Sequence, residues 1–206
     1  MRALAADRIV VRVPAMFRAL VSMLVLCGAI GIIVEGRARI LRSGSEVRLK
    51  TAPVDPRDLF RGDYVVLNYD ISTLDLSGLQ GDRDFGRGDP IHVQLTPGTD
   101  GFARPVGAYK IRPPVNGADV VIEGHVLTAG ACPRAENGTV DCSRTRNGVR
   151  VAYGLESYFV PQGTGLAIER TERSRLEIVA AVAPSGSSAI KRLLIDGKLV
   201  HAEPPF

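Results

Sequence analysis

The three histidines, His92, His125 and His201, are the residues whose types most directly suggest chemistry. Glu123 lies two residues before His125, and residues at i and i+2 share one face of a β-strand. A carboxylate beside an imidazole is half of a metal site or of an acid–base pair. No third ligand occurs at a suitable spacing. The pattern therefore favours two solvated strand side chains and predicts neither a metal site nor a cofactor.

Other catalytic signatures are incomplete in this sequence. No Gly-rich phosphate loop opens a helix, and no Gly-x-Ser-x-Gly nucleophile motif occurs. Arg-Gly-Asp occurs at 61–63 and 87–89, which we interpret as chance in a chain rich in these residues rather than as an adhesion motif. The sequence therefore favours a protein that is not an enzyme. An enzyme that uses Asp63, Lys110, Glu123 or His125 remains the alternative if these side chains converge in one cleft.

The composition fits one globular domain with an appendage. The chain has 206 residues, 45% of them hydrophobic and 23% charged, with 22 glycines and 13 prolines that suit many short strands joined by turns. The formal net charge is +4, but the first 18 residues alone carry four arginines against one aspartate. Because the rest of the chain is nearly balanced, the charge does not predict nucleic-acid binding.

A chargeless segment near the N-terminus predicts a membrane anchor. Residues 19–34 form a run of 16 residues without a charge. As a helix this run covers roughly 24 Å of a bilayer core that is about 30 Å thick, and Arg18 would extend to the interface. We therefore expect a cytoplasmic basic arm at 1–18, a transmembrane anchor at 19–34, a polar tether at 35–46 and an exported β domain at 47–206.

Three alternatives to an uncleaved anchor fit the sequence less well. A cleaved signal peptide needs small residues at a cleavage site, and the run instead ends in IIVEGRAR. Lipid attachment at Cys27 would want a small residue before it, where Leu26 stands. A buried core helix is disfavoured by the basic residues that precede the apolar run at the extreme N-terminus.

The arginines of the basic arm and the cysteines predict the orientation. Basic residues before the apolar run favour a cytoplasmic N-terminus, although Arg37, Arg39 and Arg42 weaken the asymmetry. Cys132 and Cys142 flank a nine-residue loop that contains an Asn-Gly turn signal. A disulfide there would contribute about 2–3 kcal/mol and would require an oxidising compartment. Two unrelated thiols are the alternative. Together the signals predict a domain outside the cytoplasmic membrane.

The remaining chain alternates as β-strands do. In EVRLKT, Val47 and Leu49 alternate with charged residues, and Asp196-Gly197 is a strong two-residue hairpin signal. These patterns predict a mostly-β antiparallel barrel or sandwich domain preceded by one N-terminal transmembrane helix. Short helices are expected near Pro56–Leu59 or Ser157–Phe159. Further strands are predicted in YVVLNYDI, IHVQL, FARPVGAYKI, ADVVIEGHVL, GVRVAYGL and LEIVAAVA.

The segment PRDLFRGDYVVLNYD is the densest stretch of specialised residues. Gly62 can adopt φ > 0 and Asp63 can hydrogen-bond to nearby amides, so the pair predicts a tight turn into a strand. Alternation then places Tyr64 on one face and both Leu67 and Tyr69 on the other. These residue types account for a structural corner and require no reaction.

The octapeptide GDYVVLNY resembles the bacterial family named for the GDYXXLXY motif and matches each of its specified positions. The blocks PVDPRDLFRGDYV, YFVPQGTGLAIE and AIKRLLIDGK are also similar, so the resemblance runs from about Lys50 to Lys198. Gln162 departs from it, because many members have Glu there. The resemblance implies a membrane-anchored protein of unknown function, often encoded beside a polytopic membrane protein.

A weaker resemblance is to type I signal peptidases. GDYVVL is similar to their turn and strand, and Lys110 in YKIRP loosely matches their later lysine. The nucleophile position, eight residues before Gly62, is Val54, so the Ser–Lys dyad is incomplete.

We therefore expect an exported β domain in the bacterial cytoplasmic membrane that binds or assembles with a polytopic membrane-protein partner. The alternatives are an enzyme, an inactive relative of signal peptidases, or a barrel that binds a small ligand.

Overall fold

A computed structural model of the chain describes residues 14–52, 64–115, 117–132, 147–159, 171 and 175–204. At residues 52, 64–66 and 159 it describes the backbone alone. The chain divides into two compact units, one ending at Arg39 and the other beginning at Ile40.

The helix α2 (Ala15–Ser43) contains the predicted anchor and is longer than expected. It begins directly after Pro14, whose carbonyl accepts hydrogen bonds from the N–H groups of Phe17 and Arg18. The expected tether at 35–46 is helical as far as Ser43, and a strand begins at Ser45. The cause is a run of good helix formers, supported by a Glu35–Arg39 ion pair across one turn at 3.9 Å.

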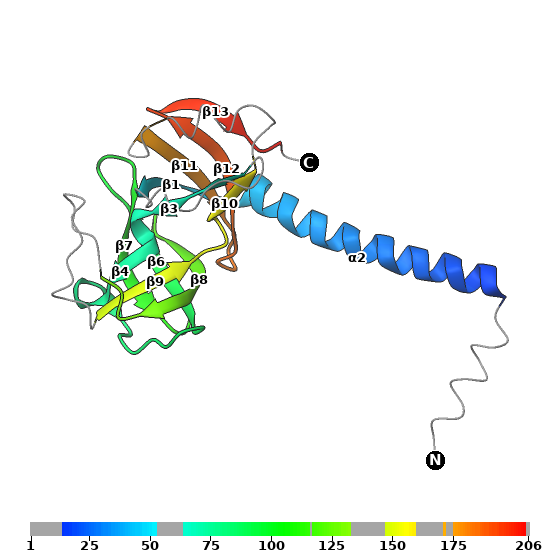
Figure 1. Cartoon of the computed structure of the whole chain (residues 1–206), viewed down its shortest axis with the longest axis horizontal. Coiled ribbons are helices and arrows are strands. Elements are labelled where there is room, and N and C mark those ends of the chain that lie inside the picture. Colours follow the sequence, from blue (N-terminus) through cyan, green and yellow to red (C-terminus); the bar gives the residue numbers. More distant parts are fainter. Residues whose placement is uncertain are drawn as a thin grey trace, which may run out of the picture. The chain divides into compact units, whose positions relative to one another are not determined.

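The body is built from strands, as predicted. In the described residues a five-stranded sheet has the order β13-β12-β11-β1-β3, and a six-stranded sheet has the order β4-β9-β8-β6-β7-β5 (Figure 1). A further pair joins β10 to β2. The strands are β1 (Ser45–Ala52), β2 (Tyr64–Val66), β3 (Asn68–Tyr69), β4 (Thr73–Asp75), β5 (Gln80–Gly81), β6 (Pro90–Pro97), β7 (Ala103–Tyr109), β8 (Val120–Ala129), β9 (Gly148–Ala152), β10 (Ser157–Phe159), β11 (Leu176–Val182), β12 (Ser188–Ile195) and β13 (Lys198–Ala202).

The two larger sheets enclose one hydrophobic core. Almost all neighbouring strands run antiparallel, and the short β5 pairs with β7 in parallel. Each sheet contributes its apolar face, because side chains alternate between the faces of a strand. The mostly-β barrel or sandwich fold after an N-terminal helix is therefore confirmed. Core residues from the two sheets include Val47, Leu49, Ile178 and Leu193, and Ile91, Val93, Leu95, Ile122 and Val151.

The clearest local patterns are found where they were predicted. Val47 and Leu49 are buried in β1. Asp196 and Gly197 have φ of 50° and 73°, so they form a hairpin turn with two positive φ angles between β12 and β13.

Two local predictions were wrong. YVVLNYDI is not one strand: it is interrupted at Leu67, and a 3-10 turn, η1 (Asp70–Ser72), follows β3. Ser157–Phe159 is the strand β10 rather than a helix, because it pairs with β2. The alternative helix at 56–59 lies outside the described residues.

Gly124 in β8 provides a test of core packing. A Cβ at this position would lie 2.7 Å from a Val151 methyl and 2.8 Å from the Ala152 carbonyl oxygen. We expect Gly124→Ala to lower the free energy of unfolding by about 1–3 kcal/mol, because the backbone must move. The measurement is urea unfolding of the full chain in detergent, followed by circular dichroism.

Gly78→Ala is the matched control for this substitution. A Cβ at Gly78 would meet no atom within 4 Å, and the residue has no positive φ. The free energy of unfolding of the Gly78→Ala variant should stay unchanged or rise slightly. Equal stability of the two variants would contradict the packing at Gly124.

Candidate functional site

The motif segment changes its partner strand in the middle of the motif. Tyr64–Val66 form β2, which pairs with β10, whereas Asn68–Tyr69 form β3, which pairs with β1. Leu67 lies between the two strands, and its N–H donates to the carbonyl oxygen of Glu156 at 2.8 Å. Gly62 and Asp63 of the predicted turn lie outside the described residues, as does the side chain of Tyr64.

Leu67 and Tyr69 are both buried in the core. The Tyr69 hydroxyl donates to the carbonyl oxygen of Leu155. The Tyr69 N–H donates to the Ser72 hydroxyl at 3.0 Å, which fixes the turn after β3. The second tyrosine of the motif thus holds the chain between β9 and β10 in place.

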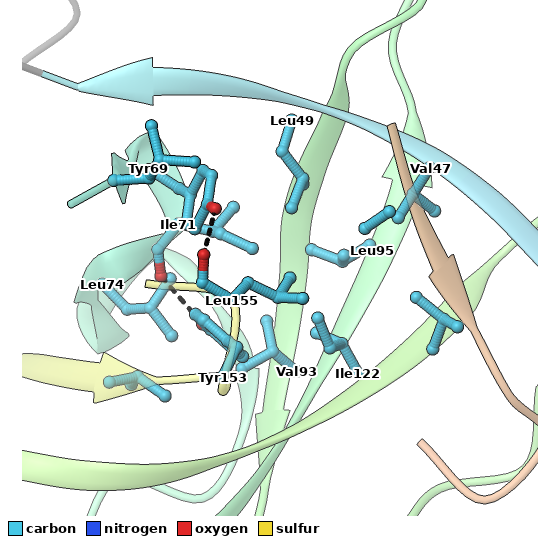
Figure 2. Packing of buried hydrophobic residues seen from close by; sticks show 14 of the residues in the cluster. Val47, Leu49, Tyr69, Ile71, Leu74, Val93, Leu95, Ile122, Tyr153 and Leu155 are labelled. Atoms are coloured by element: carbon cyan, nitrogen blue, oxygen red, sulfur yellow. Dashed lines mark hydrogen bonds between the residues drawn. The ribbon is translucent and has the colours of Figure 1, made fainter. Parts of the chain in front are cut away.

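Tyr153 makes the same kind of hydrogen bond in the opposite direction, back to the segment that contains Tyr69. The Tyr153 hydroxyl donates to the carbonyl oxygen of Ile71 at 2.8 Å. Figure 2 shows both bonds among the core side chains. We call Tyr69, Ile71, Tyr153 and Leu155 the tyrosine clasp. It joins two segments that are distant in sequence by reciprocal bonds from side chain to backbone.

Polar partners hold the Tyr153 end of the clasp. The Tyr153 N–H donates to the Glu156 carboxylate at 2.6 Å, and the Ser188 hydroxyl of β12 donates to the Tyr153 carbonyl at 3.2 Å. Gly154 follows with φ of 74°, which allows the tight turn between them. The clasp is therefore anchored to the five-stranded sheet as well as to the motif.

The environment of the clasp keeps both hydroxyls protonated. Burial raises the pKa of Tyr69 and of Tyr153 well above the ordinary tyrosine value, and the nearby Glu156 charge raises both further. A protonated hydroxyl that already donates to a carbonyl is a structural group rather than an acid or a base. The clasp therefore gives Tyr69 a structural role, whereas the corner predicted at Gly62 and Asp63 stays a prediction.

Tyr158 of β10 differs from the clasp tyrosines. It is 3% exposed, yet its hydroxyl has no hydrogen-bond partner among the residues that the structure describes. Its ring meets the His201 ring edge-on, with centroids 5.8 Å apart. Burial raises the pKa of Tyr158, and the Glu203 charge adds to this. In register Tyr158 lies opposite Val65, directly beside the first half of the motif.

The carboxylate–imidazole pair predicted on one strand occurs in β8. Glu123 is half-buried opposite His92 of β6, whereas His125 is exposed opposite Pro90. Within the described residues no group of three or more His, Cys, Asp and Glu side chains is placed to hold a metal ion.

Lys110 has partners of its own, away from that pair. Its ammonium lies 3.8 Å from the Asp84 carboxylate and 5.8 Å from the centre of the Phe85 ring. Asp63, the fourth residue of the enzyme alternative, lies outside the described residues. The structure thus gives Lys110 and the pair in β8 different neighbours.

Cys132 is disulfide-bonded, and Cys27 in the apolar helix is free. Cys142 lies outside the described residues, so the Cys132–Cys142 bridge stays a prediction. Val54 and Gln162, which bear on the two resemblances, also lie outside them.

Sequence reasoning missed Tyr153 and Glu156. The only local signal for them is a tyrosine followed by glycine directly after the strand pattern GVRVA. Their role depends on contacts with Ile71 and Leu67, more than 80 residues earlier in the chain.

Comparison with known proteins gives one match. A family model described as "GDYXXLXY protein" matches residues 26–193, which is most of the chain. No curated protein matches the chain, and no solved structure does.

Substitution of the buried tyrosines by phenylalanine tests the clasp. Tyr69→Phe and Tyr153→Phe should each lower the free energy of unfolding by about 1–3 kcal/mol, because each leaves a buried carbonyl without its donor. Tyr158→Phe is the matched control, since the Tyr158 hydroxyl has no partner to lose in the described part of the chain. It should be neutral or stabilising. Equal losses for all three variants in urea unfolding would contradict the clasp.

The raised tyrosine pKa values predict a loss of stability at alkaline pH. Above about pH 10 the unfolded chain releases the protons of Tyr69, Tyr153 and Tyr158, whereas the folded chain retains them. Ionisation of these three tyrosines should therefore leave the free energy of unfolding constant below about pH 10. It should then fall by about 1.4 kcal/mol per pH unit for each tyrosine.

Absorbance of tyrosinate at alkaline pH, recorded beside urea unfolding, measures this dependence. Tyr69→Phe should reduce the slope of stability against pH by about one third, since one of three protons is removed. An unchanged slope in that variant would show that Tyr69 ionises equally in the folded and unfolded chain.

Proposed function

The chain belongs to the GDYXXLXY protein family, and we propose that this member is a single-pass membrane protein whose exported β domain is an accessory to a membrane-protein partner. The observation that carries this proposal is the exposed apolar helix. The most apolar 18-residue stretch of α2 has no buried residue, and large apolar side chains are exposed on all sides of it. A helix that is apolar on every side and uncovered by protein needs lipid around it.

The dimensions of the helix suit a single span. Its 29 residues cover about 44 Å, which exceeds the roughly 30 Å of a bilayer core and leaves room for polar ends. Met23, Val25 and Ile32 are each at least two-thirds exposed in the chargeless run. Burial of each such side chain in lipid contributes about 1.5–3 kcal/mol, so the run supplies ample free energy for insertion.

The proposed topology has the basic arm at 1–18 in the cytoplasm, the anchor at 19–34 and the body on the far side. The arginines before the anchor support this orientation. The disulfide at Cys132 also supports it, because disulfides persist in oxidising compartments such as the periplasm. The domain boundary expected at 47 then lies within β1, which enters the body at Ser45.

An accessory role fits the body better than the ligand-binding barrel does. Core side chains, including both clasp tyrosines, pack between the two larger sheets (Figure 2). The body also exposes apolar side chains that a protein partner would cover. These are Ile111, Val115, Leu127, Leu199 and Val200.

Membrane insertion is tested by a charge in the middle of the anchor. Leu26→Arg places an arginine at the centre of the chargeless run, at a cost of about 2.5–3.5 kcal/mol of insertion free energy. We expect the variant protein to be lost from membranes washed with alkaline carbonate, whereas the unmodified chain stays. Phe17→Arg, at the edge of the run beside Arg18, is the control and should stay in the membrane.

Orientation and partner are tested on the same membranes. Alkaline phosphatase fused after Phe206 should be active. A fluorescent protein that matures only in the cytoplasm should be dark when it is fused at the same position.

The partner is tested separately. After crosslinking in intact cells and purification in mild detergent, a polytopic membrane protein should accompany the full chain. Phosphatase inactivity would contradict the topology, and recovery of the chain alone would contradict the accessory role.

A further inference from the structure

The part of α2 that follows the chargeless run is helical and basic. Residues 35–43 contain three arginines against one glutamate, which is a net charge of +2. This stretch is continuous with the anchor, because α2 ends only at Ser43. A helix rises about 1.5 Å per residue, so the whole stretch lies within roughly 14 Å of the end of the apolar run. We call residues 35–43 the basic collar.

Helix geometry sets the depth of the basic collar relative to a bilayer. Arg18 and Arg37 are 19 residues apart in α2, which corresponds to a rise of roughly 28 Å. The hydrocarbon core of a bilayer is about 30 Å thick, and each headgroup layer adds about 5–8 Å. When Arg18 lies at one boundary of the hydrocarbon core, Arg37 therefore lies at the other. Arg39 and Arg42 follow within the headgroup layer.

The arginines of the collar occupy more than one side of the helix. Consecutive residues are about 100° apart around a helix axis, so Arg37 and Arg39 lie on nearly opposite sides, and Arg42 lies on the side of Arg39. All three residues are exposed. Lipids that surround the helix can therefore reach a guanidinium from either side.

Contacts within the protein do not account for the charge of the collar. Glu35 lies 3.9 Å from Arg39, with side chains that are 52% and 74% exposed, and it compensates one arginine. The negative end of the helix dipole favours a cation in the last turn, which explains Arg42 but not Arg37, six residues before Ser43. Each arginine also interacts within the chain. A guanidinium has five N–H donors, however, so an exposed one retains donors for a further acceptor.

The chemistry and depth of these side chains select the ligand. A guanidinium matches the geometry of a phosphate and donates two parallel hydrogen bonds to it. Phosphates are the acceptors that every phospholipid headgroup presents at this depth. An anionic phospholipid also carries a net negative charge, which attracts basic residues next to a membrane-spanning helix, whereas a zwitterionic one does not.

We propose that the basic collar binds the headgroup phosphates of anionic phospholipids in the leaflet at the C-terminal end of the anchor. Arg37 donates to a lipid on one side of the helix, and Arg42 donates to a lipid on the other. This inference rests on the proposed membrane anchor, but it does not depend on which side of the membrane holds the body.

Photolabelling of the full chain in phosphatidylcholine vesicles tests the collar. The probe is phosphatidylglycerol or phosphatidylcholine that carries the same photoreactive group near its glycerol backbone, and mass spectrometry measures the label at residues 35–43. We expect phosphatidylglycerol to label the collar about fivefold more than phosphatidylcholine, which is the effect of one basic residue near an anionic surface. Equal labelling by the two lipids would overturn the proposal.

Arg37→Gln combined with Arg42→Gln should remove this preference, because the Glu35–Arg39 pair that remains has no net charge. The matched control is Arg83→Gln combined with Arg87→Gln, which removes two exposed arginines from the segment before β6. The control should keep the preference for phosphatidylglycerol. The same preference in both double variants would show that the collar arginines do not select the lipid.

The unmodified chain provides a measurement that needs no variant. In about 1 M salt the Debye length is about 3 Å, so the preference for phosphatidylglycerol should decline. A preference that is independent of salt would contradict the proposal. Removal of the unmodified chain from membranes by alkaline carbonate would overturn the anchor and the collar together, whereas a chain that stays in the membrane without preferring phosphatidylglycerol would overturn the collar alone.

Discussion

Buried backbone groups must be hydrogen-bonded, and this constraint is most demanding where the motif segment leaves one strand partner for another. At Leu67 the chain exits the pairing with β10 and has not yet entered the pairing with β1. The Leu67 N–H and the carbonyls of Ile71 and Leu155 would otherwise lie unpaired in the core. The Glu156 carbonyl accepts from the Leu67 N–H, and the two hydroxyls of the tyrosine clasp donate to the two carbonyls. The rings of both tyrosines also fill the core. Both larger sheets depend on this junction, since the β3 side pairs with β1 and the Tyr153 side continues from β9.

Local patterns were sufficient to predict the elements whose causes are local. The Asp196-Gly197 turn depends on two residues that tolerate positive φ, and β1 depends on alternation within a few positions. The break at Leu67 could not be predicted in this way, because nothing in VVLNY differs from a continuous strand. It results from competition between β10 and β1, which are separated in sequence by about a hundred residues. Ser157–Phe159 was assigned wrongly for the same reason, since β2 is what makes it a strand.

The candidate site residues show the same contrast between patterns that are local in sequence and contacts that depend on the fold. The alternation of side chains along a strand predicted that Glu123 and His125 lie on one face of β8. In the sheet, the strand register sets Glu123 of β8 directly opposite His92 of the neighbouring strand β6. The N–H of Glu123 donates to the carbonyl oxygen of Gly186, in the turn between β11 and β12. No spacing in the sequence encodes this grouping, although each member was visible as a residue type.

Two residues of the motif that identifies the family have structural roles in the described part of the chain. Its buried residues, Leu67 and Tyr69, are committed to packing and to backbone carbonyls, so a substrate has no access to them. What the motif does is position other elements. It sets β2 against β10 and β3 against β1, and through the clasp it orients the chain that leads out of β9. Because β9 pairs with β8, the same junction also supports β8.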